Sequence, residues 1–323
     1  MEKFDVICIG AALIDLVAQV ERHPSDDDEV FVSNLSLLSG GAAANTAYAC
    51  AKIGLSTAFV GKLGQGDIFT EKIISDFNDV LVETMLIKYS NLYKTGSAYV
   101  ALDEKGERRI YAHSGAANYL TKNDLLEEEI TATKLIFLSS LRNIKPLLHA
   151  AKIGRKHNIP VILNPGMLII DQGFDYIKNL LEEIDVLIIS QKEFKTLFKI
   201  KENDLSEDSI RERSVSLFDL GVKVIVVTLG EKGAFLLTSK RDELIQSLKL
   251  EKVIDTTGAG DAFSAGFIYG LVQNLNLKFE HLRKNVKIGN FVAGNCIQRL
   301  GARNGIIGRN ELKTFLATTN KKI

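Results

Sequence analysis

The sequence predicts an α/β protein with a mostly parallel central sheet between two layers of helices, and with a small β-sheet lid. Three observations support this three-layer α/β/α prediction. Short apolar runs rich in Val and Ile recur along the chain, most are followed by a longer helical pattern, and two strand-like segments interrupt that order. Strand–helix alternation is typical of a parallel sheet that helices cover on both faces.

The apolar runs and helical patterns alternate as a parallel sheet requires. Strands are expected at 4–10, 56–64, 134–140, 159–166, 185–191 and 223–230, with a further alternating strand at 247–253. Helices are expected at 45–54, 144–158, 206–221 and 261–274. Because the strand runs are apolar without alternation, both faces of the sheet should be buried.

Two segments depart from this order and predict the lid. Residues 11–38 resemble short strands with a polar turn, and residues 93–112 alternate like a hairpin around the turn at 103–107. A small sheet here would cover the carboxyl ends of the main strands, where open α/β sheets bind ligands. We expect one domain over residues 1–312, with a C-terminal tail at 313–323.

The composition excludes several classes of protein. Hydrophobic residues make up 46% of the chain, and 40 basic residues balance 40 acidic ones. This balance argues against a nucleic-acid-binding protein. No apolar run is long enough to span a membrane, and the N-terminus does not resemble a secretory signal. The three cysteines, in apolar surroundings, predict buried free thiols and a cytoplasmic protein.

The stretch VIDTTGAGDAFSAGF at 253–267 carries the strongest chemical signal. Gly258 and Gly260 are expected at a strand-to-helix turn, where backbone N–H groups and the helix dipole form an anion hole suited to phosphate. Asp261, in the first helical turn, would orient and deprotonate an attacking hydroxyl. The alternative is that Asp261 only caps a helix and the glycines only make a turn.

A second glycine segment starts at Gly40 and Gly41 and opens a helix of small residues. Asn45 lies one turn in and offers both a donor and an acceptor to sugar hydroxyls. The alternative is close packing of a helix on the sheet. Other nucleotide-binding patterns are missing, because there is no GxxxxGK[ST] loop and no third glycine for GxGxxG. The five histidines show no HExxH or comparable metal-binding spacing.

Together these two segments resemble the signatures of the ribokinase family, also called the PfkB carbohydrate kinases. The first signature comprises Gly40, Gly41, Asn45, Ala47, Gly54 and Gly64. The second comprises Asp255, Thr256, Gly258, Ala259, Gly260, Asp261, Ala265 and Gly266. The resemblance extends from about residue 4 to residue 310 and implies a ribokinase-like fold. It also implies an ATP-dependent kinase that phosphorylates a primary hydroxyl of a small sugar.

The resemblance assigns roles to individual residues. Asp261 would be the catalytic base, and Gly258, Ala259 and Gly260 would form the anion hole. The implied substrate contacts are Asp15, Gly41, Asn45, Thr95 and Tyr111. The implied ATP contacts are Thr228, Gly230, Gly233 and Asn290. The alternative for Asn290 is that it is an ordinary polar helix residue.

The resemblance further implies Mg²⁺ and, in many members, a monovalent cation such as K⁺. The family usually carries Asn-x-x-Glu near the phosphates, where this chain has Ser190 and Glu193. Glu193 would hold Mg²⁺ through water, and Ser190 would do so more weakly because its reach is shorter. Asp255 and Thr257 resemble the loop that binds the monovalent cation.

Two other functions stay open at this point. One is a nucleoside kinase of adenosine type, since small alanines after Gly41 could leave space for a base. The other is a non-catalytic regulator that binds nucleotide or sugar, which the replacement at Ser190 suggests. Family members often pair through their lids, so we also expect a homodimer.

Overall fold

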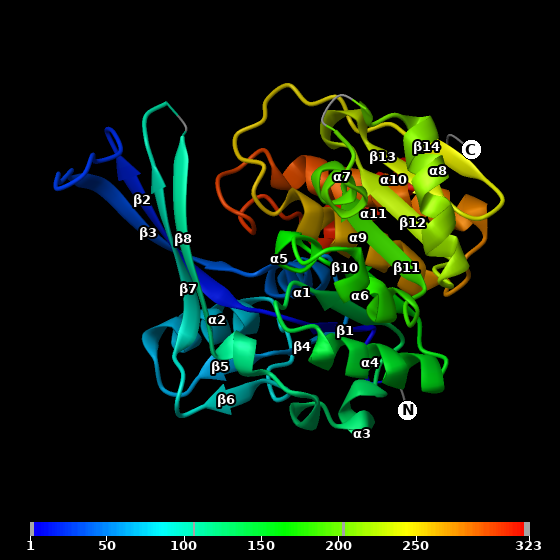
Figure 1. Cartoon of the computed structure of the whole chain (residues 1–323), viewed down its shortest axis with the longest axis horizontal. Coiled ribbons are helices and arrows are strands. Elements are labelled where there is room, and N and C mark those ends of the chain that lie inside the picture. The colour runs from blue at the N-terminus through cyan, green and yellow to red at the C-terminus, as the bar shows by residue number, and fades with distance from the viewer. Residues whose placement is uncertain (1–2, 106, 202–203, 320–323) are drawn as a thin grey trace.

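The computed structural model describes residues 3–105, 107–201 and 204–319. Within these residues a sheet of eight strands runs through the body of the protein in the order β14-β13-β12-β11-β10-β9-β1-β4 (Figure 1). The strands are β1 (Val6–Ile9), β4 (Thr57–Val60), β9 (Ile136–Ser139), β10 (Val161–Asn164), β11 (Val186–Ser190), β12 (Val224–Thr228), β13 (Ala234–Leu237) and β14 (Asp242–Ile245). All neighbouring pairs are parallel except β12–β13 and β13–β14.

Helices cover both faces of this sheet, so the predicted three-layer architecture is confirmed. One face carries α1 (Ala42–Lys52), α2 (Ile68–Asp79), α9 (Ala259–Gln273), α10 (Phe279–Cys296) and α11 (Arg309–Thr319). The other carries α3 (Glu127–Ile130), α4 (Lys145–Lys156), α5 (Met167–Ile170), α6 (Phe174–Leu181), α7 (Gln191–Phe198) and α8 (Glu207–Asp219). Short 3₁₀ turns lie at η1 (Ala116–Tyr119), η2 (Lys122–Asp124) and η4 (Gly230–Lys232).

The strands of the central sheet are mostly apolar because both of their faces are buried, as the sequence predicted. Along β1, Val6 and Cys8 belong to one hydrophobic core while Ile7 and Ile9 belong to the other, and all four are fully buried. A strand between two helix layers must be apolar at every position, because successive side chains point to opposite faces.

The predicted lid is a four-stranded sheet that stands beside the body, on the left of Figure 1. Its strands are β2 (Leu13–Val20), β3 (Val32–Gly40), β7 (Thr95–Leu102) and β8 (Arg108–Gly115), in the order β3-β2-β7-β8. The β2–β3 and β7–β8 pairs are antiparallel, whereas β2 and β7 run parallel. Residue 106, in the predicted turn of the second hairpin, lies outside the described residues. A separate pair, β5 (Lys62–Gly64) and β6 (Lys88–Ser90), lies near the base of the lid.

Two expectations were wrong. Residues 247–253 form no strand, and Leu248 and Leu250 instead lie over Gly294 of α10. The expected end of the domain at residue 312 falls inside α11, where Phe315 stacks on Phe291 with ring centroids 3.8 Å apart. Residues 313–319 therefore pack on the body, and 320–323 lie outside the described residues.

The three cysteines are buried free thiols, as predicted. Across the described part of the chain, every helix is too short or too polar to cross a lipid bilayer.

Candidate active site

The first turn of α9 carries the aspartate that the sequence singles out. The N-cap of this helix, Gly258, has a left-handed backbone with φ of 77°, and Asp261 follows within the first turn. The Asp261 carboxylate lies deep in the protein, although the residue as a whole is not fully buried. A base that must reach a substrate hydroxyl requires this combination of burial and access.

The pKa of Asp261 is raised to about 7. Burial away from water is the main cause, and the nearby negative charge of Glu193 acts in the same direction. A hydrogen bond from Asn45 and the positive charge of Arg303 lower the pKa and so oppose these effects. A carboxylate with a pKa close to neutral pH is deprotonated in part of the molecules and basic enough to accept a proton.

The glycines of this turn have different roles. A Cβ on Gly258 would lie 2.6 Å from Ala302 Cβ, so packing and the backbone conformation both require glycine there. A Cβ on Gly260 would meet nothing within 4 Å, and among the described residues its N–H has no backbone partner. The N–H of Ala259 donates to Thr256 O at 3.2 Å. Gly258 N–H also has no backbone partner among the described residues, and Gly260 differs in the open space around it. The predicted anion hole at these three residues stays a prediction.

Asn45, in the first turn of α1, reaches Asp261 from the other end of the sequence. Its Nδ2 donates to Asp261 Oδ2 at 3.0 Å. Gly41 begins this helix with φ of 93°, and a Cβ there would lie 2.4 Å from Ala11 O. The structure thus brings together Asn45 of the first glycine signature and Asp261 of the second. Gly41 must be glycine because of its positive φ and its close contact with Ala11.

Asp15 enters the site from β2 of the lid. Burial raises its pKa to about 6, and the positive charge of Arg303 partly opposes that effect. A Cβ on Gly40 would lie 2.4 Å from Asp15 Oδ2, so the glycine leaves room for this carboxylate. In the lid, Asp15 is flanked across the strands by Leu38 and Ala98.

Thr95 and Tyr111 do not join this group. Tyr111 pairs with Tyr99, one position along β7 from the row that contains Asp15, so its side chain points to the opposite face of the lid. Thr95 shares the parity of Tyr99, and its hydroxyl lies 2.5 Å from that of Thr70 on α2. The strand register therefore gives no support to the predicted substrate contacts of these two residues.

Ser190 and Glu193 lie where β11 meets α7, at the carboxyl edge of the sheet. They form a reciprocal capping box, with Glu193 N donating to Ser190 Oγ at 3.2 Å and Ser190 N donating to Glu193 Oε2 at 2.8 Å. Thr228 ends the neighbouring strand directly beside Ser190. The serine therefore has a structural role in starting α7.

The acidic groups here fit a magnesium ion. Burial raises the pKa of Glu193, and Glu193 and Asp261 lie close enough for the charge of one to raise the pKa of the other. The buried carboxylate of Glu193 offers the hard oxygen atoms that Mg²⁺ and its bound waters prefer. Glu193 and Ser190 are the residues that would hold its water shell.

The predicted nucleotide residues follow β12. Gly230 has φ of 62° and open space around a built Cβ, as a ligand-facing turn would require. Gly233 has φ of 100°, and a Cβ there would lie 2.1 Å from Ile245 O, so packing alone requires it to be glycine. Asn290 Nδ2 donates to Ile245 O and Gln246 O at 3.2 and 3.0 Å. These bonds give the amide nitrogen of Asn290 a structural role. This role is consistent with the alternative that Asn290 is an ordinary polar helix residue.

Asp255 and Thr257 stabilise the turn before α9. Asp255 Oδ1 accepts hydrogen bonds from Thr257 N and Oγ1 at 3.0 and 2.7 Å, and Asp255 Oδ2 accepts one from Gly301 N at 2.8 Å. The carboxylate thus ties this turn to the loop after α10. A monovalent cation here stays a prediction.

Arg303, in that same loop, is a site residue that the sequence reading missed. Its Nε donates to Asn45 Oδ1 at 2.9 Å, although the two residues are 258 positions apart. The only local signal was an arginine set among glycines and apolar residues at 301–308. Burial lowers the pKa of Arg303 to about 10, so the guanidinium stays charged at neutral pH.

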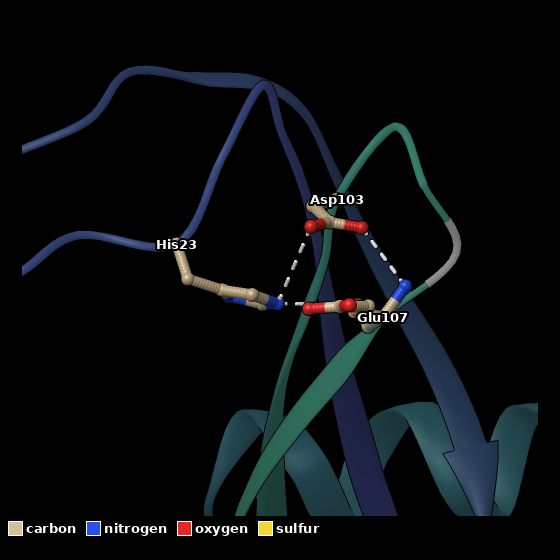
Figure 2. A group of neighbouring side chains, drawn as sticks. All are labelled: His23, Asp103 and Glu107. Atoms are coloured by element: carbon tan, nitrogen blue, oxygen red, sulfur yellow. Dashed lines mark hydrogen bonds and ion pairs between the residues drawn. The ribbon is translucent and has the colours of Figure 1, made fainter.

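A separate cluster of His23, Asp103 and Glu107 ties the two hairpin tips of the lid together (Figure 2). His23 Nε2 lies 3.2 Å from Glu107 O and 3.9 Å from Asp103 Oδ2. Asp103 Oδ1 accepts hydrogen bonds from Glu107 N at 2.8 Å and from Lys105 N at 3.0 Å. These contacts account for the cluster as a structural tie far along the lid from Asp15.

Because Asp261 is buried, the difference in stability between the wild type and Asp261→Asn should depend on pH. The folded pKa is about 7 and the usual value is 3.8, so the folded state binds more protons between these pH values and stability falls as pH rises. Asp261→Asn should therefore gain free energy of unfolding relative to the wild type from pH 4 to pH 7. The gain should be on the order of 4 kcal/mol, since one pKa unit corresponds to about 1.4 kcal/mol. Urea unfolding of both proteins measures it, and a difference that is constant with pH would contradict it.

Comparisons with known proteins identify the family of the chain. The sequence profile of the pfkB family carbohydrate kinases matches residues 3–307. A ribokinase from Staphylococcus aureus is 26% identical over 304 residues, which cover 93% of this chain and 96% of that protein. A deoxyribokinase from Salmonella typhi is 27% identical over 272 residues, which cover 84% of this chain and 86% of the other.

A solved structure extends the likeness to three dimensions. The ribokinase of Arabidopsis thaliana in complex with ribose and ATP superposes with a TM-score of 0.85 at 26% identity, over 97% of this chain and 98% of that one. The match of the family profile, the shared fold and the assembled signatures lead to one conclusion. The chain belongs to the pfkB family of carbohydrate kinases.

Proposed function

We propose that the protein is an ATP-dependent kinase that transfers the γ-phosphate to a primary hydroxyl of a small sugar. Membership of the carbohydrate kinase family sets the reaction class, which is phosphotransfer to an alcohol. The observation that carries the proposal is Asp261, a carboxylate with a pKa of about 7 one residue after the open backbone of Gly260. This arrangement sets a base beside a position for a phosphoryl group.

In the proposed reaction Asp261 accepts the proton of the sugar hydroxyl as its oxygen attacks the γ-phosphorus. The bond from that phosphorus to the β–γ bridging oxygen breaks, and ADP leaves with the bond's electrons. The N–H of Gly260 and the positive end of the α9 dipole stabilise the charge on the transferred group. Bound Mg²⁺ would neutralise phosphate charge, and Asp15 and Asn45 would bind sugar hydroxyls.

We favour a sugar over a nucleoside as the acceptor. Of the alanines that could have left space for a base, Ala43, Ala44 and Ala47 are fully buried in the core against the sheet, and Ala42 is partly exposed. Ser190, which prompted the regulator hypothesis, forms a capping box with the retained Glu193, so the serine has a structural reason of its own. The buried free thiols suit the reducing cytoplasm, where we place the enzyme.

An acceptor panel tests this function. The full chain would be incubated with MgATP and each of D-ribose, 2-deoxy-D-ribose, D-fructose, 2-keto-3-deoxygluconate, adenosine, inosine and cytidine, and ADP release would be followed. We expect turnover with a sugar and none without an acceptor. Turnover with nucleosides alone would support the nucleoside kinase. Absence of turnover together with ligand-dependent thermal stabilisation would support the regulator.

We further propose that the protein forms a homodimer through its lid. The lid face opposite Asp15 exposes a row of apolar side chains, namely Leu35, Leu37, Tyr99 and Tyr111. Tyr111 is 68% exposed, and such a patch is typical of an interface between proteins. Tyr111→Glu combined with Leu35→Glu should convert the dimer to a monomer in analytical ultracentrifugation. Ile68→Glu, which alters an exposed apolar residue on α2, serves as the control. A wild-type monomer at micromolar concentration would rule the dimer out.

A further inference from the structure

Arg303 is a buried cation with one well-defined hydrogen bond. The residue is only 8% exposed, and its Nε donates to Asn45 Oδ1 at 2.9 Å. Its Nη1 lies 3.7 Å from Asp76 Oδ2, and the guanidinium carbon lies 5.0 and 5.6 Å from the ring centroids of Tyr48 and Phe77. Among the described residues, neither Nη1 nor Nη2 has a hydrogen-bond partner. A guanidinium buried with so few partners costs stability, so stability alone gives no reason for an arginine here.

The bond to Asn45 fixes which end of the amide faces the catalytic aspartate. A guanidinium has only donors, so it can bind Asn45 through the amide oxygen but not through the amide nitrogen. The nitrogen is thereby turned toward Asp261, where Nδ2 donates to Oδ2 at 3.0 Å. The chain of contacts runs from the loop after α10 through α1 to α9. Each group in it has one orientation that satisfies its neighbours.

We propose that Arg303 is a positioning residue for phosphoryl transfer: it locks the Asn45 amide so that this amide holds Asp261 as a hydrogen-bond acceptor. The inference rests on the proposed role of Asp261 as the base. Arg303 acts on that carboxylate through Asn45 and through its own charge, without touching the substrate. Without the lock, the Asn45 amide could turn over and present its oxygen to Asp261, which would favour the protonated acid.

The charges around Asp261 come from several elements. Glu193 at the start of α7 and the positive charge of Arg303 act on its pKa in opposite directions. The thiol of Cys296 on α10 also senses Asp261, and burial raises the pKa of this thiol to about 12, so it stays neutral. Arg303 in turn senses the charges of Asp15 and Asp76. Arg303 is thus the cation that favours the deprotonated form of the base.

The experiment compares Arg303→Met, Arg303→Lys and the wild type over pH 6–9, with MgATP and the sugar that the acceptor panel identifies. The acid limb of kcat/KM against pH should move up by about one pH unit in Arg303→Met, because a nearby opposite charge typically lowers a carboxyl pKa by 1–3. The ratio of wild-type to variant kcat/KM should therefore shrink about tenfold between pH 6 and pH 9. Arg303→Lys, which keeps the charge, should give an intermediate limb even if Arg303→Met does not fold.

Lys72→Met is the matched control. Lys72 lines the same cavity of about 120 Å³ as Arg303, and it pairs with Asp76 at 2.5 Å. This variant loses one positive charge from the cavity but no bond to Asn45, so its acid limb should coincide with that of the wild type. Thermal melting of every variant would establish that it is folded.

A second readout needs no substrate. The titration of Asp261 can be followed by ¹³C NMR in protein labelled at aspartate Cγ, with the signal assigned through its loss in Asp261→Asn. Its midpoint should rise in Arg303→Met and stay in place in Lys72→Met. A purely structural arginine would lower activity by the same factor at every pH and leave this midpoint unmoved, which would overturn the inference alone. Full activity in Asp261→Asn would instead overturn the proposed function.

Discussion

Asp261→Asn should lower kcat by about 10²–10⁴-fold, the range by which a positioned acid or base usually accelerates a reaction. An amide of the same size keeps the cavity filled and still accepts a hydrogen bond from Asn45 Nδ2, but it cannot take a proton. The KM values for ATP and sugar should change much less than kcat. Steady-state kinetics at pH 7.5 would measure both constants.

The nearby Asp255→Asn variant provides the comparison for this result. Asp255 is buried and its oxygens accept bonds from Thr257 and Gly301, so its loss should weaken the fold of the turn. The two variants alter the same segment but should have different defects. Asp261→Asn should lose turnover at unchanged or higher stability, whereas Asp255→Asn should lose stability. Asp261→Asn with wild-type kcat would refute the base assignment.

Two alanine substitutions in one turn should separate stability from activity. Gly258→Ala should destabilise the protein by several kcal/mol, because its φ is 77° and the new Cβ would lie 2.6 Å from that of Ala302. Gly260→Ala should leave the free energy of unfolding unchanged or slightly higher, since alanine favours a helix by up to about 1 kcal/mol. Its methyl group would project into the open space that we assign to the phosphoryl group, so kcat/KM should fall at least about tenfold.

Urea unfolding and initial-rate kinetics on the two variants decide this prediction. The expected pattern is a crossed one, in which Gly258→Ala is unstable and Gly260→Ala is stable but slow. Gly230→Ala is a useful reference, because Gly230 also has a positive φ but meets no atom within 4 Å. If Gly260→Ala retained full activity, the anion position would have to lie elsewhere.

The sequence was sufficient for the layers of the fold and for the two helix starts that hold the site. Continuous apolar runs identify strands buried on both faces, and the glycines before α1 and α9 mark where the backbone turns. It was not sufficient at 247–253, where Leu248 and Leu250 alternate as in a strand but lie over Gly294 of α10. An alternating pattern shows that one face of a segment is apolar. It does not show whether the segment is a strand paired in a sheet or an irregular stretch packed against a helix.

The lid shows a second limit of sequence reading. Thr95 and Tyr111 were expected at the substrate, but strand register places them on the face opposite Asp15. A shift of one residue moves a side chain to the other face of a sheet, and the pairing of β2 with β7 cannot be read from either strand alone. Arg303 escaped notice for a related reason, since its partner lies 258 residues earlier in the chain.

The contacts of the loop after α10 have a consequence for the newly made chain. Gly301 donates a hydrogen bond to Asp255 and Arg303 donates one to Asn45, so the proposed site joins segments that are far apart in the sequence. A nascent polypeptide that ends before residue 301 carries both glycine signatures and yet lacks these ties. The hydrogen-bonded arrangement around Asp261 can therefore form only after residue 303 has been synthesised.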